Sequence, residues 1–285
     1  MATAEAIHIV VRRENLRGAV AVTVDGSLSP PPLRMEIAGG GRMLLRQSGN
    51  PILLARVDDD HSGVRIHRRP GFRSPLPPLS AELCRRGPDW LHRFADHLIT
   101  AHNGPLHAGR TLLRSKPALA PSTWTRELFH SWPTAYVDWM VGCTPIIPLR
   151  PLSAVDAPRV KAYRRRCREG IVPPVLLWWV SAFDGWLLLD GHDRAVAALA
   201  EGREPAAVVL SRGADVREQT AVITAVARHQ EHVLTRASDP RAEEVFSRQL
   251  ARVAAGMPYE SGRTVAWPLP GGIAVWDELR HAFPA

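Results

Sequence analysis

Two short apolar runs near the middle of the chain, joined by a turn and followed by a short helical stretch, constrain the fold most. Residues 175–180 read VLLWWV and residues 186–190 read WLLLD, with Phe183-Asp184-Gly185 between them. Apolar runs of this length on either side of such a turn predict a β-hairpin. Residues 195–201 are rich in strong helix formers and are followed by Gly202, which predicts a short helix directly after the hairpin.

The residues on either side of the hairpin extend this unit. Residues 146–149 and 206–210 are short apolar runs that predict two further strands. Between the first strand and the hairpin, Asp156 is expected to cap a helix that has Pro158 in its first turn and stops at Gly170. The resulting order is β-α-β-β-α-β, which predicts a compact unit with a mixed sheet over residues 143–212.

The N-terminal residues are expected to form a small antiparallel sheet. Its strands are predicted at residues 7–11, 19–24, 43–46, 52–57 and 64–67, with turn signals between them. The triple glycine at 39–41 is interpreted as a hairpin turn, because nothing beside it resembles a phosphate-binding P-loop. A proline-rich connector at 70–78 and a helix at 88–100 follow, and residues 101–123 are expected to be irregular.

The C-terminal residues are expected to be helical, with periodic stretches at 216–234 and 239–255. The predicted fold class is therefore α+β, in four segments. Residues 1–100 form a β-rich part that ends in a helix, and residues 101–142 form an aromatic-rich connecting segment. Residues 143–212 form the central unit, and residues 213–285 form a helical C-terminal part.

The charge of the chain favours an anionic partner without identifying it. The net charge is +8, but the arginines are scattered apart from the run Arg164-Arg165-Arg166, which we interpret mainly as a solvated helix face. A nucleotide or phosphate satisfies this charge as well as a nucleic acid does. The three cysteines are far apart and lack zinc-site spacing, which suits reduced thiols in a cytoplasmic protein. No apolar run is long enough to span a bilayer, so no membrane partner is expected, and the oligomeric state is left open.

The turn after the second strand of the hairpin predicts an anion site. Gly191 allows a tight turn and a close approach of a ligand to the backbone. The helix that follows directs its free N–H groups at this turn, and Arg194 adds a bidentate donor. Asp190 and Asp193 could hold Mg²⁺ or accept a proton, and His192 could act as an acid, a base or a donor. The alternative is that both aspartates only cap the helix and that Arg194 pairs with one of them.

The residues around this turn resemble the ParB/sulfiredoxin superfamily. The resemblance rests on Gly-Ile-Val-Pro-Pro-Val-Leu-Leu from residue 170, the hairpin, and Leu-Leu-Leu-Asp-Gly-His-Asp-Arg-Ala-Val-Ala-Ala-Leu from residue 187, and it covers about residues 143–212. Members of the superfamily include CTP-binding partition proteins, sulfiredoxins, free-serine kinases and ParB-like nucleases. The resemblance implies the same β-α-β-β-α-β fold, with a strand, a glycine turn and a helix N-terminus at the site.

The departures from each branch of the superfamily narrow the expected activity. Sulfiredoxins need a cysteine in this turn, where this chain has His192. The G-E-R-R type motif and the Asn-Pro-Arg loop of partition proteins are missing. The amino-acid kinases of this fold resemble the turn best, because Asp190 and Arg194 match. Their usual second histidine is Asp193 here, and Asp156 stands where their catalytic glutamate would be.

The resemblance therefore implies a nucleotide-binding protein that uses ATP, ADP or CTP with Mg²⁺. Gly191 and Arg194 would hold the phosphates, and Asp190 would position the metal or take a proton. His192 or Asp193 would be the secondary group, with Asp156 across the cleft. The first expectation is phosphotransfer to a small-molecule acceptor, or nucleotide hydrolysis. A DNA-associated ParB-like protein or nuclease, and a non-catalytic nucleotide-sensing or interaction module, are the alternatives.

Overall fold

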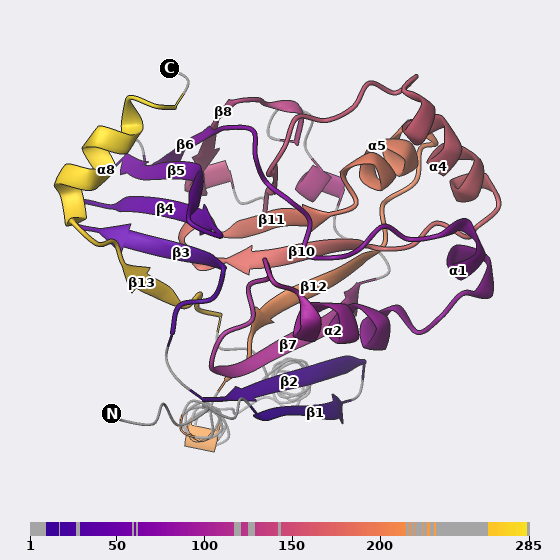
Figure 1. Ribbon diagram of the computed structural model, residues 1–285, viewed down its shortest axis with the longest axis horizontal. Coiled ribbons are helices and arrows are strands. Elements are labelled where there is room, and N and C mark those ends of the chain that lie inside the picture. The colour runs from indigo at the N-terminus through magenta and orange to yellow at the C-terminus, as the bar shows by residue number, and fades with distance from the viewer. Residues whose placement is uncertain are drawn as a thin grey trace, which may run out of the picture.

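The chain folds into a mixed α+β structure, described here from a computed structural model (Figure 1). The structure describes residues 10–16, 18–26, 29–58, 60, 62–116, 121–124, 129–141, 144–214 and 262–283, together with single positions between 217 and 231. The helices expected at 216–234 and 239–255 therefore lie largely outside the described residues. Within the described ranges, no helix is both long enough and apolar enough to cross a membrane.

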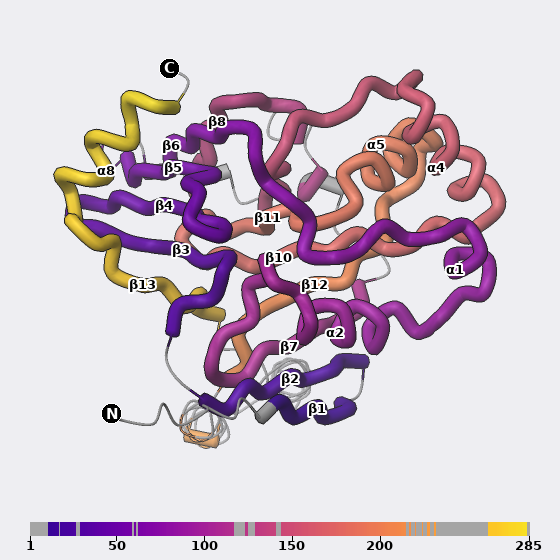
Figure 2. Tube along the Cα trace, viewed as in Figure 1, coloured from indigo at the N-terminus to yellow at the C-terminus, as the bar shows by residue number. Residues whose placement is uncertain are grey.

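The larger of two β-sheets contains seven strands. They are β1 (Val10–Leu16), β2 (Ala19–Asp25), β7 (Gly109–Lys116), β9 (Ile146–Pro148), β10 (Val175–Val180), β11 (Gly185–Asp190) and β12 (Ala207–Arg212). Their order across the sheet is β1-β2-β7-β12-β10-β11-β9. β12 pairs parallel with β10 and β11 pairs parallel with β9, whereas the other neighbours are antiparallel. β1 and β2 form one edge of the molecule in the tube view (Figure 2).

The order of elements predicted for the central unit is confirmed. β9 is followed by α4 (Pro158–Arg168), the hairpin of β10 and β11, α5 (His192–Ala200) and β12. The predicted cap of α4 is wrong, because its N-cap is Ala157 and no side chain makes a capping hydrogen bond there. Pro158 at the first helical position supplies a preformed helical φ angle instead, so the helix begins without a cap from Asp156.

The expectation that residues 101–123 are irregular is wrong, because β7 lies among them. β7 pairs with β2 on one side and with β12 on the other, so it joins the N-terminal hairpin to the central unit. Only Leu112 and Leu113 in its centre are large apolar residues, so the sequence shows little strand signal. The pairing with two neighbours fixes this segment as a strand, and the large sheet contains strands from three of the four predicted segments.

The smaller sheet contains six strands. They are β3 (Leu33–Ala38), β4 (Arg42–Gln47), β5 (Asn50–Asp58), β6 (Gly63–Arg68), β8 (Thr134–Asp138) and β13 (Ala266–Pro268), in the order β13-β3-β4-β5-β6-β8. The hairpin predicted at the triple glycine is confirmed, because residues 39–41 connect β3 to β4. β3 itself was not predicted, since the charged residues Arg34 and Glu36 interrupt its apolar pattern.

The sheets and helices stack in four layers. α4 and α5 cover one face of the large sheet, and the small sheet packs on its other face. The alternation along β10 shows both contacts: Leu176 and Trp178 lie in the core between the sheets, and Leu177 lies in the core under α4 and α5. α2 (Trp90–Thr100), which follows α1 (Ala81–Arg86), also packs into the core between the sheets. α8 (Gly272–Arg280) covers the outer face of the small sheet.

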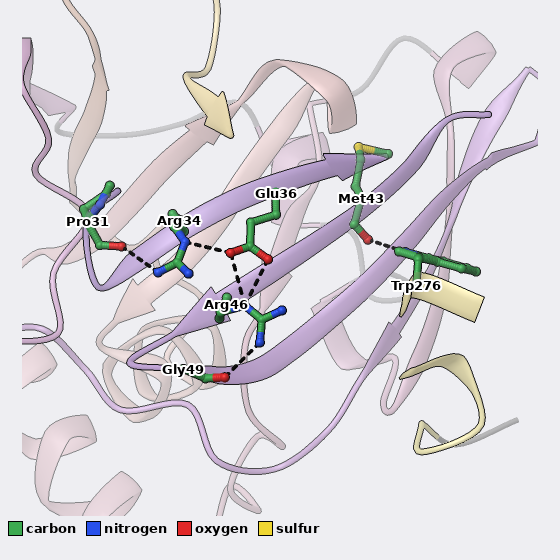
Figure 3. A network of polar contacts seen from close by, with 7 residues as sticks. All are labelled: Pro31, Arg34, Glu36, Met43, Arg46, Gly49 and Trp276. Atoms are coloured by element: carbon green, nitrogen blue, oxygen red, sulfur yellow. Dashed lines mark hydrogen bonds and ion pairs between the residues drawn. The ribbon is translucent and has the colours of Figure 1, made fainter. Parts of the chain in front are cut away.

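A buried carboxylate on the small sheet is compensated by two arginines (Figure 3). Glu36 is 1% exposed and accepts hydrogen bonds from Arg34 Nε at 2.7 Å and from Arg46 Nε at 2.9 Å. A buried charge of this kind is tolerated only when it is paired and hydrogen-bonded. Met43 lies on the neighbouring strand β4. Its carbonyl accepts a hydrogen bond from the indole of Trp276 at 2.9 Å, which docks α8 on the sheet.

Arg68 at the end of β6 ties the small sheet to the edge of the large one. Its side chain is fully buried and donates to the carbonyl oxygens of Pro148 at 2.9 Å and Ser131 at 2.7 Å, and to those of Pro133 and Thr134. Burial lowers the pKa of Arg68 to about 10, so the guanidinium stays charged at neutral pH. It has no carboxylate partner among the described residues. Besides the carbonyls, it donates to the Ser131 hydroxyl at 3.1 Å and lies over the ring of Trp132.

Replacement of Arg68 should destabilise the fold strongly. The change Arg68→Met leaves the buried carbonyls without donors, so the free energy of unfolding should fall by about 3 kcal/mol. Arg65→Met is the matched control, because Arg65 lies on the same strand with a side chain that is 62% exposed and should change stability by less than about 1 kcal/mol. Urea denaturation measures both, and equal effects would contradict the proposed role of Arg68.

Candidate anion-binding site

The glycine in the turn between β11 and α5 is required by both conformation and space. Gly191 has φ of 93°, which side chains rarely adopt, and an added Cβ would lie 2.9 Å from Val175 Cγ1. Gly191 is also the N-cap of α5, and no side chain makes a capping hydrogen bond. The alternative in which Asp190 and Asp193 cap this helix is therefore wrong.

Asp190 and Arg194 form a buried ion pair across the turn. Arg194 is 4% exposed, and its Nη2 donates to Asp190 Oδ2 at 2.6 Å and to the Pro174 carbonyl at 2.9 Å. Burial acts to lower the pKa of Arg194, but the charge and hydrogen bond of Asp190, followed by those of Tyr163, outweigh it and the pKa is raised. The guanidinium is therefore a fixed positive charge at the start of α5, and the pairing expected under the capping alternative is observed.

A cavity of about 170 Å³ lies against this pair. Three arginines line it, and they come from three different places in the chain: Arg150 after β9, Arg159 on α4 and Arg194 on α5. The remaining lining residues are Phe72, Ser74, Leu76, Pro77, Pro78, Leu79, Tyr163, Leu189, Asp190 and His192. The proline-rich connector therefore forms one wall of the site, a role that nothing in its sequence indicates.

Hydrogen bonds from both sheets hold the connector in place. Ser74 Oγ donates to Asp190 Oδ1 at 2.7 Å. Gln47 on β4 is 4% exposed and clamps the backbone of Arg73, donating to its carbonyl at 2.8 Å and accepting from its N–H at 2.9 Å. Asn103 donates to the carbonyls of Arg73 and Ser74 at 3.2 and 3.1 Å. The small sheet thus positions a wall of a site whose charged groups belong to the large sheet.

His192 is neutral and serves as a hydrogen-bond acceptor. It is 2% exposed, and its Nε2 accepts the N–H of Leu149 at 3.2 Å, which places the remaining proton on Nδ1. Burial, followed by the charges of Arg150 and Arg194, holds the pKa of His192 well below 6.5. Near neutral pH the imidazole therefore carries no charge, so it does not act as a cationic acid there.

Asp193 positions two of the cavity arginines without lining the cavity itself. Its Oδ2 lies 3.1 Å from Arg159 Nε and 3.5 Å from Arg150 Nη2, and its Oδ1 accepts from Ser153 Oγ at 2.8 Å. Asp156, expected across the cleft, is exposed and is not among the lining residues. The structure therefore places Asp190, His192 and Arg194 at the cavity, around the turn at Gly191. Asp193 contacts Arg150 and Arg159 without lining the cavity, and Asp156 lies outside it.

The arginine run on α4 is largely used within the protein. Arg164 Nε and Arg168 Nη1 both donate to Glu201 Oε1, at 2.6 and 2.8 Å. Arg166 lies over the ring of Tyr163, 5.1 Å from its centroid. The two contacts with Glu201 attach α4, which carries the cavity arginine Arg159, to the end of α5.

One donor at the site has no partner. Arg194 Nε is buried and makes no hydrogen bond with any residue that the structure describes. A buried donor left unsatisfied costs about 1–3 kcal/mol, and such groups are uncommon in native proteins. Three arginines against two aspartates leave one excess positive charge, and the N-terminal end of α5 adds its dipole. The site therefore favours an anion.

The side chains do not suit Mg²⁺. Asp190 is the one carboxylate that lines the cavity within the described chain, and its two oxygens already accept from Ser74 and Arg194. Mg²⁺ needs an octahedral set of oxygen ligands, and three guanidinium groups in the same cavity oppose a cation. The described residues also contain no group of three or more His, Cys, Asp or Glu side chains that could hold a metal ion.

The size of the cavity sets the size of the ligand group. Ligand pockets for drug-sized molecules span about 300–1,000 Å³. A volume of about 170 Å³ holds a phosphate-sized anion but not an entire nucleotide.

The buried state of His192 should make stability depend on pH. In the unfolded chain a histidine takes up a proton near pH 6.5, whereas native His192 stays neutral, so stability falls as the pH drops through 6.5. Between pH 7 and pH 5.5, the wild-type protein should lose about 1 kcal/mol more unfolding free energy than His192→Gln, which keeps an acceptor for Leu149. Urea denaturation at both pH values measures this, and equal losses would mean that the pKa of His192 is not lowered in the native state.

The chain matches no known family model, no curated protein and no solved structure.

Proposed function

We propose that this chain is a ParB/sulfiredoxin-like protein that binds the phosphate group of a nucleotide, or of another small phosphorylated molecule, in the arginine-lined cavity. The observation that carries the proposal is the buried, unpartnered Nε of Arg194 in a cavity that Arg150 and Arg159 also line. A phosphate oxygen would satisfy this donor and would place the negative charge at the N-terminal end of α5.

The three cavity arginines differ in how firmly they are held in place. Arg194 is rigid, because Asp190 and the Pro174 carbonyl fix its Nη2, whereas the side chains of Arg150 and Arg159 are 41% and 62% exposed. A phosphate would therefore meet one preorganised donor inside the cavity and two adjustable donors at its mouth. Preorganised donors add affinity because little conformational entropy is lost when the ligand binds.

The arrangement of the central strands supports the family part of the proposal. β9, β10, β11 and β12 lie in the order β12-β10-β11-β9, and α4 and α5 cover one face. The phosphate would lie at the end of β11, where the glycine turn leads into α5. This is the position at which the superfamily resemblance implies a nucleotide.

Phosphotransfer is the second candidate, and one contact favours it. Asp190 Oδ1 accepts a hydrogen bond from the Ser74 hydroxyl at 2.7 Å, so this oxygen faces a hydroxyl within the cavity. A substrate hydroxyl in that place could attack the terminal phosphorus of a nucleotide and pass its proton to Asp190. The bond to the leaving nucleoside diphosphate would then break with its electron pair.

The phosphate proposal predicts a specific role for Arg194. Arg194→Lys keeps a positive charge for Asp190 but removes Nε, so it should weaken the binding of pyrophosphate by about 1–3 kcal/mol. Arg164→Lys is the matched control, because Arg164 pairs with Glu201 outside the cavity. Isothermal titration calorimetry measures both affinities. Equal affinity of Arg194→Lys and wild type would overturn the proposal, provided that circular dichroism shows both to be folded.

The variant Asp190→Asn separates binding from phosphotransfer. It removes a negative charge from the cavity, so pyrophosphate affinity should stay the same or rise. If the chain transfers phosphoryl groups, turnover of ATP or CTP should fall about 10²–10⁴-fold in this variant. Asp184→Asn, at an exposed turn position with φ of 44°, is the control. Turnover that is absent in wild type, or unchanged in Asp190→Asn, would rule out phosphotransfer through this carboxylate.

A further inference from the structure

A second, larger hollow adjoins the anion cavity along the proline-rich connector. It is a groove of about 880 Å³ between β4, β5, the connector and the end of α2. Ser74, Leu76 and Pro77 line both the groove and the cavity, so the two hollows share this stretch of connector as a wall. The volume of the groove lies within the range of ligand pockets, which the cavity alone does not reach.

The groove is polar and carries positive charge. Among the residues that the structure describes, no Asp or Glu side chain lines it, whereas Arg69, Arg73, His97 and His102 do. Neither arginine has an ion-pair partner within the described chain, and Arg69 lies over the ring of Phe283 at 5.5 Å from its centroid. An anionic ligand that enters this groove therefore meets no electrostatic opposition from its walls.

Three side chains of the groove are available for a ligand. Arg73, Asn50 and His102 are exposed, and their side chains form no hydrogen bond with any described residue. An amide offers a donor and an acceptor side by side, which matches the edge of a nucleobase, and an imidazole ring can stack on a base. Arg73 directly precedes Ser74, which lines both the groove and the cavity.

We infer that the groove is the subsite for the nucleoside part of a nucleotide whose terminal phosphate occupies the arginine-lined cavity. This inference rests on the proposed function, because it needs the phosphate to be held by Arg194. The nucleotide would run along the connector, with the base near Asn50 and His102 and the phosphate nearest the sugar beside Arg73. The connector then contributes to both halves of the site, which gives a physical reason for its clamping by Gln47 and Asn103.

The test compares tripolyphosphate with ATP and CTP by isothermal titration calorimetry, without added metal. Wild type should bind at least one of the two nucleotides about tenfold or more tightly than tripolyphosphate. The double variant Asn50→Ala/His102→Ala removes base contacts without changing an arginine, so it should erase this preference and leave tripolyphosphate affinity within about threefold. Arg194→Lys should weaken both kinds of ligand. Arg165→Ala, an exposed arginine on α4 outside both hollows, should change neither.

The outcomes separate the inference from the proposed function. If wild type binds tripolyphosphate but neither nucleotide more tightly, the phosphate site stands and the nucleoside subsite is excluded. If the nucleotide preference survives in Asn50→Ala/His102→Ala, the base lies elsewhere and the inference is again overturned. If wild type binds none of these ligands, the proposed function itself fails.

Discussion

The ion pair between Asp190 and Arg194 is the interaction on which the rest of the site depends. Through this pair, the end of β11 is joined to the first turn of α5, and Arg194 also reaches the Pro174 carbonyl just before β10. Asp190 in turn accepts from Ser74 of the connector. One pair of side chains therefore joins a hairpin, a helix and a distant loop. The two partners are four residues apart, on either side of the turn in which Gly191 has a left-handed conformation.

Four charged side chains are deeply buried among the described residues, and they are compensated in different ways. Asp193 pairs with Arg150 and Arg159 at the cavity. Glu36 has two arginine partners, so its charge is more than balanced. Arg68 has backbone carbonyls and the Ser131 hydroxyl but no carboxylate among the described residues, and it joins the two sheets. Arg194 has one carboxylate, one carbonyl and the side chain of Tyr163 beside it, yet its Nε remains without a partner among the described residues. The arrangements around Glu36 and Arg68 are complete structural units, whereas the one around Arg194 is incomplete in the way expected of a ligand site.

The small sheet contributes to the site although none of the three cavity arginines lies on it. Gln47 on β4 forms a pair of hydrogen bonds with the backbone of Arg73, and this holds the connector over the turn. The packing of the two sheets thus places the connector as a wall of both the cavity and the neighbouring groove. A protein with only the central strands and helices would have the same turn with an open, water-filled surface above it, where the charge of Arg194 would be screened more strongly.

The sequence by itself determined the central unit and the turn. The hairpin at 175–190, the glycine stops and the strand–glycine–helix pattern depend on local preferences, and the structure follows them. Only the tertiary structure decided that β7 is a strand, because pairing with β2 and β12 outweighs its weak local signal. Tertiary contacts also made His192 a neutral acceptor, left Asp156 outside the cavity and brought the connector over Asp190. Those outcomes depend on burial and on contacts between residues far apart in the chain, and periodicity and capping preferences carry no information about either.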